Sequence, residues 1–235
     1  SKKGAVWSGV VNRSSLSVFQ KPLHLPGQQL IFTNSMSDWW NDAVPAEWRR
    51  DAMAIIKKTP QHQYQILTKR PENIARLLED AGESKLPDNV WLGAPMEDHR
   101  VRDRIKLLRE IPAKIRFLSV EPMTAEPGEL DLTGIHWVIG GGESGPHARP
   151  LKLAWVLSLR DQCVAQGVPF FFKQWGAWSN NPIAQQVPSG WKPSDWVAKQ
   201  DPNGKGGQLL EGRSWLEYPD WPGKGAYQEN GLLLQ

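Results

Sequence analysis

Six short apolar runs alternate with amphipathic stretches along most of this chain, and this alternation limits the possible folds more than any other feature. The runs cover residues 29–34, 64–68, 90–93, 115–120, 136–140 and 168–173. Nearly continuous apolar strands of this kind are typical of a parallel sheet that is covered on both faces. Apolar residues with helical spacing lie between the runs, for example Trp48, Ala52, Ile55 and Ile56. Strands and helices in series predict a parallel α/β fold.

One connection departs from this alternation. The segment 122–135 holds two prolines and is barely long enough for a helical crossover between parallel strands. We therefore expect a loop or a single turn between the fourth and fifth strands.

The composition divides the chain into three parts. Residues 1–28 form a basic N-terminal segment, and residues 29–178 contain the α/β pattern. Residues 179–235 form an extension rich in glycine, proline and tryptophan, with five tryptophans after residue 177. Disordered tails are usually poor in aromatic residues, so we expect this extension to be irregular but docked on the α/β domain.

Charge and cysteine content exclude several classes of protein. The 235 residues carry a net charge of +3, which is too small to indicate a nucleic-acid partner by itself. The one cysteine, Cys163, excludes a disulfide framework, a cysteine-rich zinc site and an iron–sulfur cluster held by this chain's own thiolates. The histidines lack HxxxH or HxH spacing, so no metal site is expected. No apolar run approaches the length of a membrane span, which predicts a cytoplasmic protein without a membrane partner.

Polar side chains follow every predicted strand at its carboxyl end. Active sites of parallel α/β proteins lie at this edge of the sheet, so these side chains are expected to share one mouth. They are Ser35, Asp38, Lys69, Arg70, Glu97, Glu121, Glu143 and Lys173. Each one alone could equally be an ordinary polar residue of a loop, but the set together favours a site.

Two of these strand ends are the sharpest candidates. The glycines of residues 140–145 let the backbone approach a ligand closely, although tight turns use the same residues. Glu121 is a candidate acid or base, and the alternative is a structural salt bridge to Arg116 or Lys69. The GxxxxGK[ST] pattern of a phosphate-binding loop is missing.

Basic and aromatic residues are compatible with a nucleic-acid-binding interface, which is a further hypothesis. Arg102, Lys106 and Arg109 share one helical face, which a solvated helix also explains. Most of the 13 tryptophans are expected to pack in the core. Four follow strand ends and are better ligand candidates, namely Trp39, Trp40, Trp175 and Trp178.

The amino-acid sequences at the strand ends resemble those of a known family. The strings are FTNSMSDWW (32–40), QYQILTKRPENI (63–74), NVWLGAPMED (89–98), IRFLSVEPM (115–123), WVIGGGESGPHARP (137–150) and LRDQCVAQGVPFFFKQWGAW (159–178). Together they are similar to the phage-associated three-cysteine-motif family, a domain of unknown function found in bacteriophages and bacteria. Members are thought to resemble radical S-adenosylmethionine enzymes, which implies a partial or TIM-like (β/α) barrel over residues 29–178.

The resemblance also implies roles for individual residues. Gly140, Gly141, Gly142 and Glu143 are similar to the element that supports the adenine of S-adenosylmethionine, and Glu121 would contact its ribose. In the same scheme the methionine part is held by residues after the first strand, namely Asn34, Ser35, Ser37 and Asp38. The substrate would then face Lys69, Arg70, Glu97 and Lys173.

The family's cysteine segment does not appear before Trp7 in this sequence. A [4Fe–4S] cluster is therefore expected only if such a segment exists elsewhere in the protein. Three functions remain as hypotheses. The first is the barrel of a radical enzyme, whose catalytic candidates are Glu121, Lys69, Glu97 and Lys173. The second is a glycosidase or sugar-binding barrel that uses strand-end carboxylates, and the third is a non-catalytic nucleic-acid-binding module. The radical-enzyme hypothesis predicts a small-molecule or nucleotide-like ligand.

Overall fold

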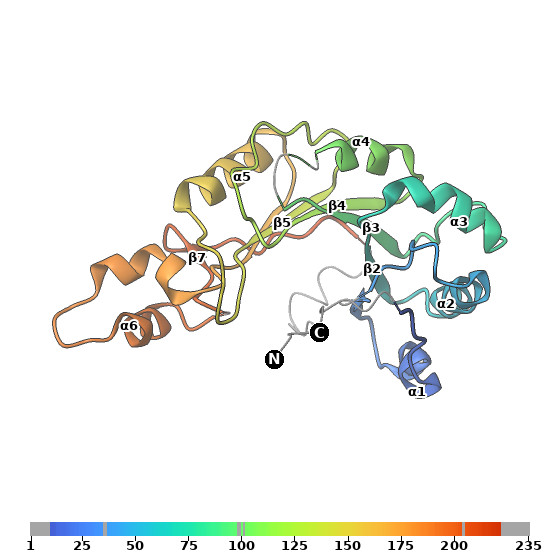
Figure 1. Ribbon diagram of the computed structural model, residues 1–235, viewed down its shortest axis with the longest axis horizontal. Helices are drawn as coiled ribbons and strands as arrows, with labels where there is room; N and C mark the ends of the chain where they lie inside the picture. The colour runs from blue at the N-terminus through green and yellow to red at the C-terminus, as the bar shows by residue number, and fades with distance from the viewer. Residues whose placement is uncertain (1–9, 35–36, 98–99, 101, 204, 222–235) are drawn as a thin grey trace.

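The computed structural model describes residues 10–34, 37–97, 100, 102–203 and 205–221. Its main sheet contains six strands in sequence order: β1 (Leu30–Thr33), β2 (Gln63–Leu67), β3 (Val90–Pro95), β4 (Ile115–Val120), β5 (Trp137–Gly141) and β6 (Phe170–Gln174). Every neighbouring pair is parallel. The sheet curls into a half-barrel whose edge strands are β1 and β6 (Figure 1). The predicted parallel α/β fold is confirmed, as an open half-barrel and not a closed ring.

Helices cover the convex face of this sheet (Figure 1). They are α2 (Ala46–Lys58), α3 (Ile74–Asp80), α4 (Asp103–Glu110) and α5 (Leu153–Ala165), with the short η2 (Pro71–Asn73) before α3. Ala52 and Ile56 of α2 and Val156 and Leu159 of α5 are buried, as their helical spacing predicts. The β4–β5 connection has no helix, which confirms the loop expected there.

Alternate residues of the strands enter two separate clusters. Leu92 and Val138 point outward and pack in the large core beneath the helices. Phe117, Trp137 and Phe171 point inward and pack in a second, aromatic cluster on the concave face. Gly93 lies opposite Phe117, and any side chain there would collide with the Phe117 ring. The concave face is therefore lined by large rings that a glycine makes room for.

The segment after β6 is ordered over most of its described length. It contains η4 (Trp178–Asn180), η5 (Pro182–Gln186), α6 (Pro193–Gln200) and the hairpin of β7 (Leu209–Leu210) and β8 (Arg213–Ser214). Leu216 then pairs antiparallel with Phe171, and the Phe172 N–H donates to the Trp215 carbonyl at 2.8 Å. This pairing covers part of the exposed edge of β6.

Two aromatic residues of the same extension pack against the rings of the concave face. Tyr218 stacks on Trp137 with ring centroids 5.2 Å apart, and Trp221 meets Trp91 at 5.0 Å. The Trp137 indole N–H donates to the Glu217 carbonyl at 2.7 Å. Packing therefore accounts for part of the tryptophan surplus.

The chain before β1 forms two short helices, α1 (Leu16–Phe19) and η1 (Lys21–His24). Within the described residues, none of the helices combines the length and apolar character of a membrane-spanning segment.

Candidate active site in the concave face

A cavity of about 770 Å³ occupies the concave face of the half-barrel. Its floor includes Phe117, Trp137 and Phe171, and its mouth lies at the carboxyl ends of the strands. Five residues predicted from sequence line it: Asn34, Ser37, Trp39, Glu121 and Lys173. Asn34 ends β1 with a φ of 56°, a left-handed conformation that asparagine tolerates better than most residues. Ser35, also predicted, lies outside the described residues.

Glu121 and Lys173 form an ion pair in this cavity. Glu121 directly follows β4, Lys173 lies on β6, and the Lys173 Nζ is 3.1 Å from the Glu121 Oε2. Burial raises the pKa of Glu121, although Lys173 and Lys205 oppose the shift. The strand between them carries Gly141, where a Cβ atom would lie 3.3 Å from the Glu121 Cγ. Glu121 pairs with Lys173 and not with the partners Arg116 or Lys69 that the salt-bridge alternative named.

The Asp38 carboxylate is surrounded by donors from its own loop and the next one. Its Oδ1 accepts from the Thr68 hydroxyl at 2.9 Å and from the Trp40 N–H at 3.0 Å. Its Oδ2 accepts from the Lys69 N–H at 3.0 Å and from the Arg70 guanidinium at 3.2 Å. These contacts join the ends of β1 and β2, which gives Asp38 a structural task. Its predicted role in cofactor binding stays a prediction.

Glu97 and Glu143 are each held by arginine or lysine outside the cavity lining. Glu97 meets Lys69 at 2.9 Å and Arg104 at 3.1 Å. Burial acts to raise the pKa of Glu97, but these cations outweigh it and the pKa is lowered. Arg149 donates to both carboxylate oxygens of Glu143, at 2.7 and 3.0 Å, and this hydrogen bonding lowers the pKa of Glu143. Their predicted contacts with ligand also stay predictions.

The glycine run has a packing reason of its own. A side chain on Gly142 would collide with the Trp175 carbonyl, and a Cβ on Gly140 would lie 3.2 Å from Leu159. The Gly142 N–H donates to the Gln174 carbonyl at 2.9 Å. Close approach of the β5 and β6 ends therefore requires glycine at Gly142, whether or not Gly140, Gly141 and Gly142 also contact a ligand.

Two cavity residues, Gln65 and Lys205, did not emerge as site candidates from motif reasoning. Gln65 is 3% exposed, lines the cavity, and its Nε2 has no hydrogen-bond partner among the described residues. The buried Nε1 of Trp39 is unpartnered in the same sense. Lys205 reaches the cavity from the extension. The alternation of β2 marks Gln65 as a polar residue facing inward, a signal available from sequence, whereas nothing local marks Lys205.

The tryptophans that follow strand ends have different surroundings. Trp39 lines the cavity, as a ligand candidate should. Trp40 and Trp175 are completely buried in the core beneath the helices, whereas Trp178 is 45% exposed outside the cavity lining. Position after a strand therefore identifies one cavity residue of the four.

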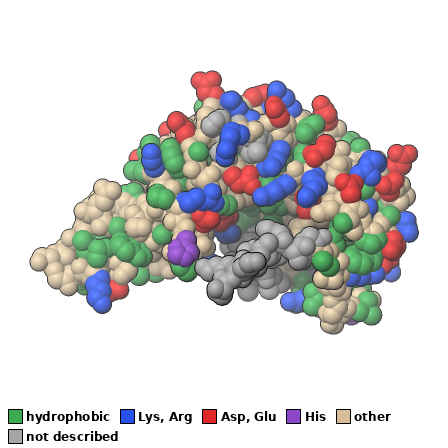
Figure 2. All heavy atoms as spheres, in the orientation of Figure 1, with side chains coloured by type: hydrophobic (Ala, Val, Ile, Leu, Met, Phe, Trp, Pro, Cys, Tyr) green, Lys and Arg blue, Asp and Glu red, His purple; other side chains and the backbone are tan. Residues whose placement is uncertain are grey.

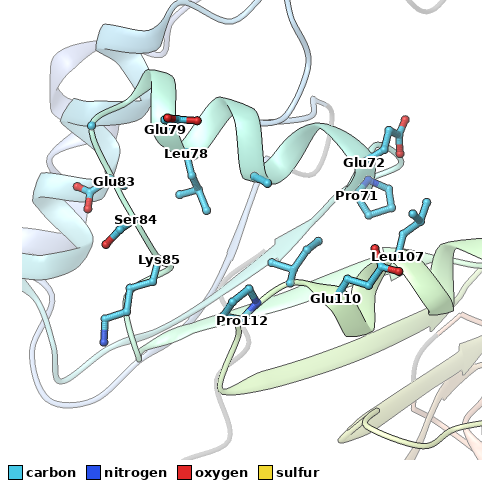
Figure 3. A pocket seen from close by; sticks show the side chains of 13 residues that line it. Pro71, Glu72, Leu78, Glu79, Glu83, Ser84, Lys85, Leu107, Glu110 and Pro112 are labelled. Atoms are coloured by element: carbon cyan, nitrogen blue, oxygen red, sulfur yellow. The ribbon is translucent and has the colours of Figure 1, made fainter.

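A second cavity, of about 830 Å³, lies on the outer surface between α3 and α4 (Figure 3). Its lining includes Glu72, Glu79, Glu83 and Glu110, and Glu83 is paired with Lys57 at 2.6 Å. None of the residues predicted from sequence as site candidates lines it. The chemistry-bearing strand ends therefore point to the concave cavity, although the outer one is slightly larger.

The basic face of α4 is largely neutralised by local contacts. Arg109 pairs with Asp131 at 2.8 Å, Lys106 pairs with an aspartate of its own helix, and Arg102 donates to the Glu129 carbonyl at 3.5 Å. Figure 2 shows acidic and basic side chains interspersed over the helices. These observations favour the solvated-helix interpretation, and the nucleic-acid partner stays a prediction.

The comparison with family models decides the affiliation of the chain. The model of a protein of unknown function, DUF5131, matches residues 3–219. The chain belongs to this family. The DUF5131 match includes the half-barrel, every candidate residue named above and most of the extension. No curated protein and no solved structure matches the chain. The domain of unknown function expected from the strand-end motifs is thus confirmed at the level of DUF5131.

The residues of this DUF5131 chain do not fit a [4Fe–4S] cluster. Its one cysteine, Cys163, is completely buried in α5 beneath the convex face of the sheet. Burial, with a smaller effect of the Glu217 charge, raises the pKa of the thiol to about 12. A cluster requires several thiolates at one accessible place, which a single buried cysteine cannot supply. The described residues also contain no group of three His, Cys, Asp or Glu side chains arranged to hold a metal ion.

Proposed function

We propose that this DUF5131 protein is an enzyme that binds a nucleoside-type small molecule in the concave cavity and uses Glu121 as its acid–base group. The observation that carries the proposal is the Glu121–Lys173 pair, which lies inside a cavity of ligand size at the carboxyl ends of parallel strands. S-adenosylmethionine is the member of this ligand class that the family resemblance favours.

The lining of the cavity suits a planar heterocycle. Phe117, Trp137, Phe171 and Tyr218 form an aromatic wall of the cavity, against which such a ring can pack. On the β1–β2 side, the Gln65 Nε2 and the Trp39 Nε1 are buried donors without partners in the described structure. Protein atoms cover both nitrogens, and an unpaired buried donor costs about 1–3 kcal/mol. A ligand acceptor such as a ring nitrogen or carbonyl recovers this cost when the side chain turns its donor toward the cavity.

Glu121 is suited to move a proton. Burial raises the pKa of Glu121 above that of an ordinary glutamate. The pKa is therefore closer to neutral pH than that of an exposed carboxyl, as proton transfer at neutral pH requires. Lys173 at 3.1 Å stabilises the ionised form once the proton has left. The pair can therefore hold a proton at a Glu121 oxygen and release it toward a ligand in the same cavity.

Sugar hydrolysis receives less support from this arrangement. Glycosidases of the usual kind need two carboxyl groups, one on each side of the scissile bond. Among the described residues that line the cavity, Glu121 is the one carboxylate, because Glu97 and Glu143 are held by cations outside it.

Binding of adenosine and of S-adenosylmethionine, measured by isothermal titration calorimetry, tests this proposal. We expect binding by the unaltered protein and a roughly tenfold loss of affinity in Gln65→Leu, which removes the unpartnered donor. The matched control is Gln185→Leu, at an exposed position of η5 outside the cavity, which should bind as the unaltered protein does. Failure of both ligands to bind at millimolar concentration, or equal affinity in Gln65→Leu, would overturn the proposal.

A further inference from the structure

We infer that Lys173 and Lys205 form an anion subsite at the mouth of the cavity, and that the ligand carries a phosphate or carboxylate group there. This inference rests on the proposed function, because it names the charge of the ligand that the same cavity takes. It also gives the C-terminal extension a part in binding that no motif indicates.

The charge of the cavity favours an anion. The charged residues among its described lining are Glu121, Lys173 and Lys205. Glu121 is in ion-pair contact with Lys173 at 3.1 Å, whereas Lys205 acts on Glu121 through its charge and forms no ion-pair contact among the described residues. A cavity with two ammonium groups and one carboxylate attracts a negatively charged ligand, and low local dielectric strengthens that attraction.

The loop that carries Lys205 is fixed to the end of β6. The Lys205 carbonyl accepts from the Gly176 N–H at 2.7 Å, and the Gly207 carbonyl accepts from the Trp175 N–H at 2.9 Å. A side chain on Gly206 would collide with the backbone of Ala177, so the two segments are in close contact. These contacts place Lys205 beside the strand that carries Lys173.

A buried carboxylate holds the far side of the same loop. Asp201 is 1% exposed, and its Oδ2 accepts from the Gln208 and Leu209 N–H groups, both at 2.7 Å. Asn181 adds a third hydrogen bond to that oxygen at 3.2 Å. Lys205 therefore extends from a loop whose backbone is anchored on both sides, which lowers the entropy lost when it contacts a ligand.

The two sides of the cavity differ in their polar groups, and this difference would orient a ligand. Lys173 and Lys205 lie on the β6 side, and the unpartnered donors of Gln65 and Trp39 lie on the β1–β2 side. Aromatic rings form the floor between them. A molecule with a planar acceptor-bearing ring at one end and an anionic tail at the other matches this distribution.

The test compares four probes by calorimetry: adenosine, adenosine 5′-monophosphate, S-adenosylhomocysteine and inorganic pyrophosphate. Adenosine carries no anion, the monophosphate carries a phosphate tail, the homocysteine derivative carries an aminocarboxylate tail, and pyrophosphate probes the anion subsite alone. Each is titrated into the unaltered protein, Lys205→Gln and Lys192→Gln. Lys192 is an exposed lysine of the same extension that does not line the cavity, which makes it the matched control.

We expect at least one tailed probe to bind about tenfold more tightly than adenosine, and that gain to disappear in Lys205→Gln but not in Lys192→Gln. The better of the two tails identifies the anion as phosphate or carboxylate. Pyrophosphate binding that Lys205→Gln abolishes supports the subsite even if adenosine fails to bind, in which case the proposed nucleoside is wrong. Equal affinity of adenosine and both tailed probes, unchanged affinity in Lys205→Gln, or no binding of any probe would overturn the inference.

Discussion

Glu121 owes its chemical character to neighbours far apart in the sequence. Gly141 leaves space for its side chain, Lys173 pairs with it, and surrounding atoms remove it from water. Desolvation raises the pKa of a carboxyl and a nearby cation lowers it, and here desolvation prevails. Glu143 shows the opposite balance, because Arg149 holds both of its oxygens and lowers its pKa.

These opposite shifts predict opposite effects of pH on stability. The pKa of folded Glu121 lies above its ordinary value of 4.5, so unfolding releases a proton in the interval between them. The contribution of Glu121 to stability is therefore fully present below about pH 4.5 and is lost as pH rises through the folded pKa. In urea unfolding from pH 4 to 8, the stability of the unaltered protein relative to Glu121→Gln should fall as pH rises.

Glu143→Gln provides the comparison of opposite sign. The pKa of folded Glu143 is lowered, so its contribution is present above its ordinary pKa of 4.5 and is lost as pH falls through the folded pKa. Extended down to about pH 3, the same measurement should therefore show stability relative to Glu143→Gln that rises with pH up to about pH 5 and then stays level. A Glu121 difference that grows with pH, as a simple surface salt bridge would give, contradicts the burial of Glu121.

Two segments of the extension after β6 contact the half-barrel. The segment at Leu216 pairs with β6, and the anchored loop 205–208 meets the mouth. Both contacts use backbone hydrogen bonds, which explains how a stretch with little periodicity is ordered. Asp201 connects the end of α6 to that loop and is the residue on which its position depends most.

Asp201→Ala should loosen the loop more than the sheet. The substitution leaves the N–H groups of Gln208 and Leu209 without their acceptor and removes one of the two hydrogen bonds of the Asn181 amide nitrogen, at a cost of about 2–4 kcal/mol. Hydrogen exchange should accelerate at residues 205–209 and stay slow in β3 and β4. Uniform acceleration over the whole chain would mean that Asp201 supports global stability and not this loop.

At the scale of the whole molecule, the sequence is sufficient to predict the parallel α/β fold and some of the strand-end residues that line the cavity. Strand ends such as those of Asn34, Glu121 and Lys173 converge because parallel strands end at one edge, and the structure brings these three to one cavity. The sheet closes only halfway, a property of strand twist and of the edge pairing at Leu216 that apolar periodicity does not encode.

Other parts of the site depend on contacts that sequence patterns do not show. Glu97 and Glu143 follow strands as Glu121 does, but Arg104 and Arg149 engage them away from the cavity. Lys205 enters through a loop that is 32 residues beyond Lys173 in a segment without periodicity. The partner of a side chain, and not its place after a strand, thus separates the cavity residues from the rest.

The most direct test of the proposed ligand site is an NMR titration that follows the tryptophan indole N–H signals while adenosine 5′-monophosphate is added. Trp39 and Trp137 line the cavity, whereas Trp191 and Trp196 pack on each other in the extension with ring centroids 5.5 Å apart. We expect the signals of Trp39 and Trp137 to shift, that of Trp39 most, because its unpartnered donor gains an acceptor. Unchanged Trp39 and Trp137 signals at saturating ligand, or shifts confined to Trp191 and Trp196, would contradict a ligand site in the concave face.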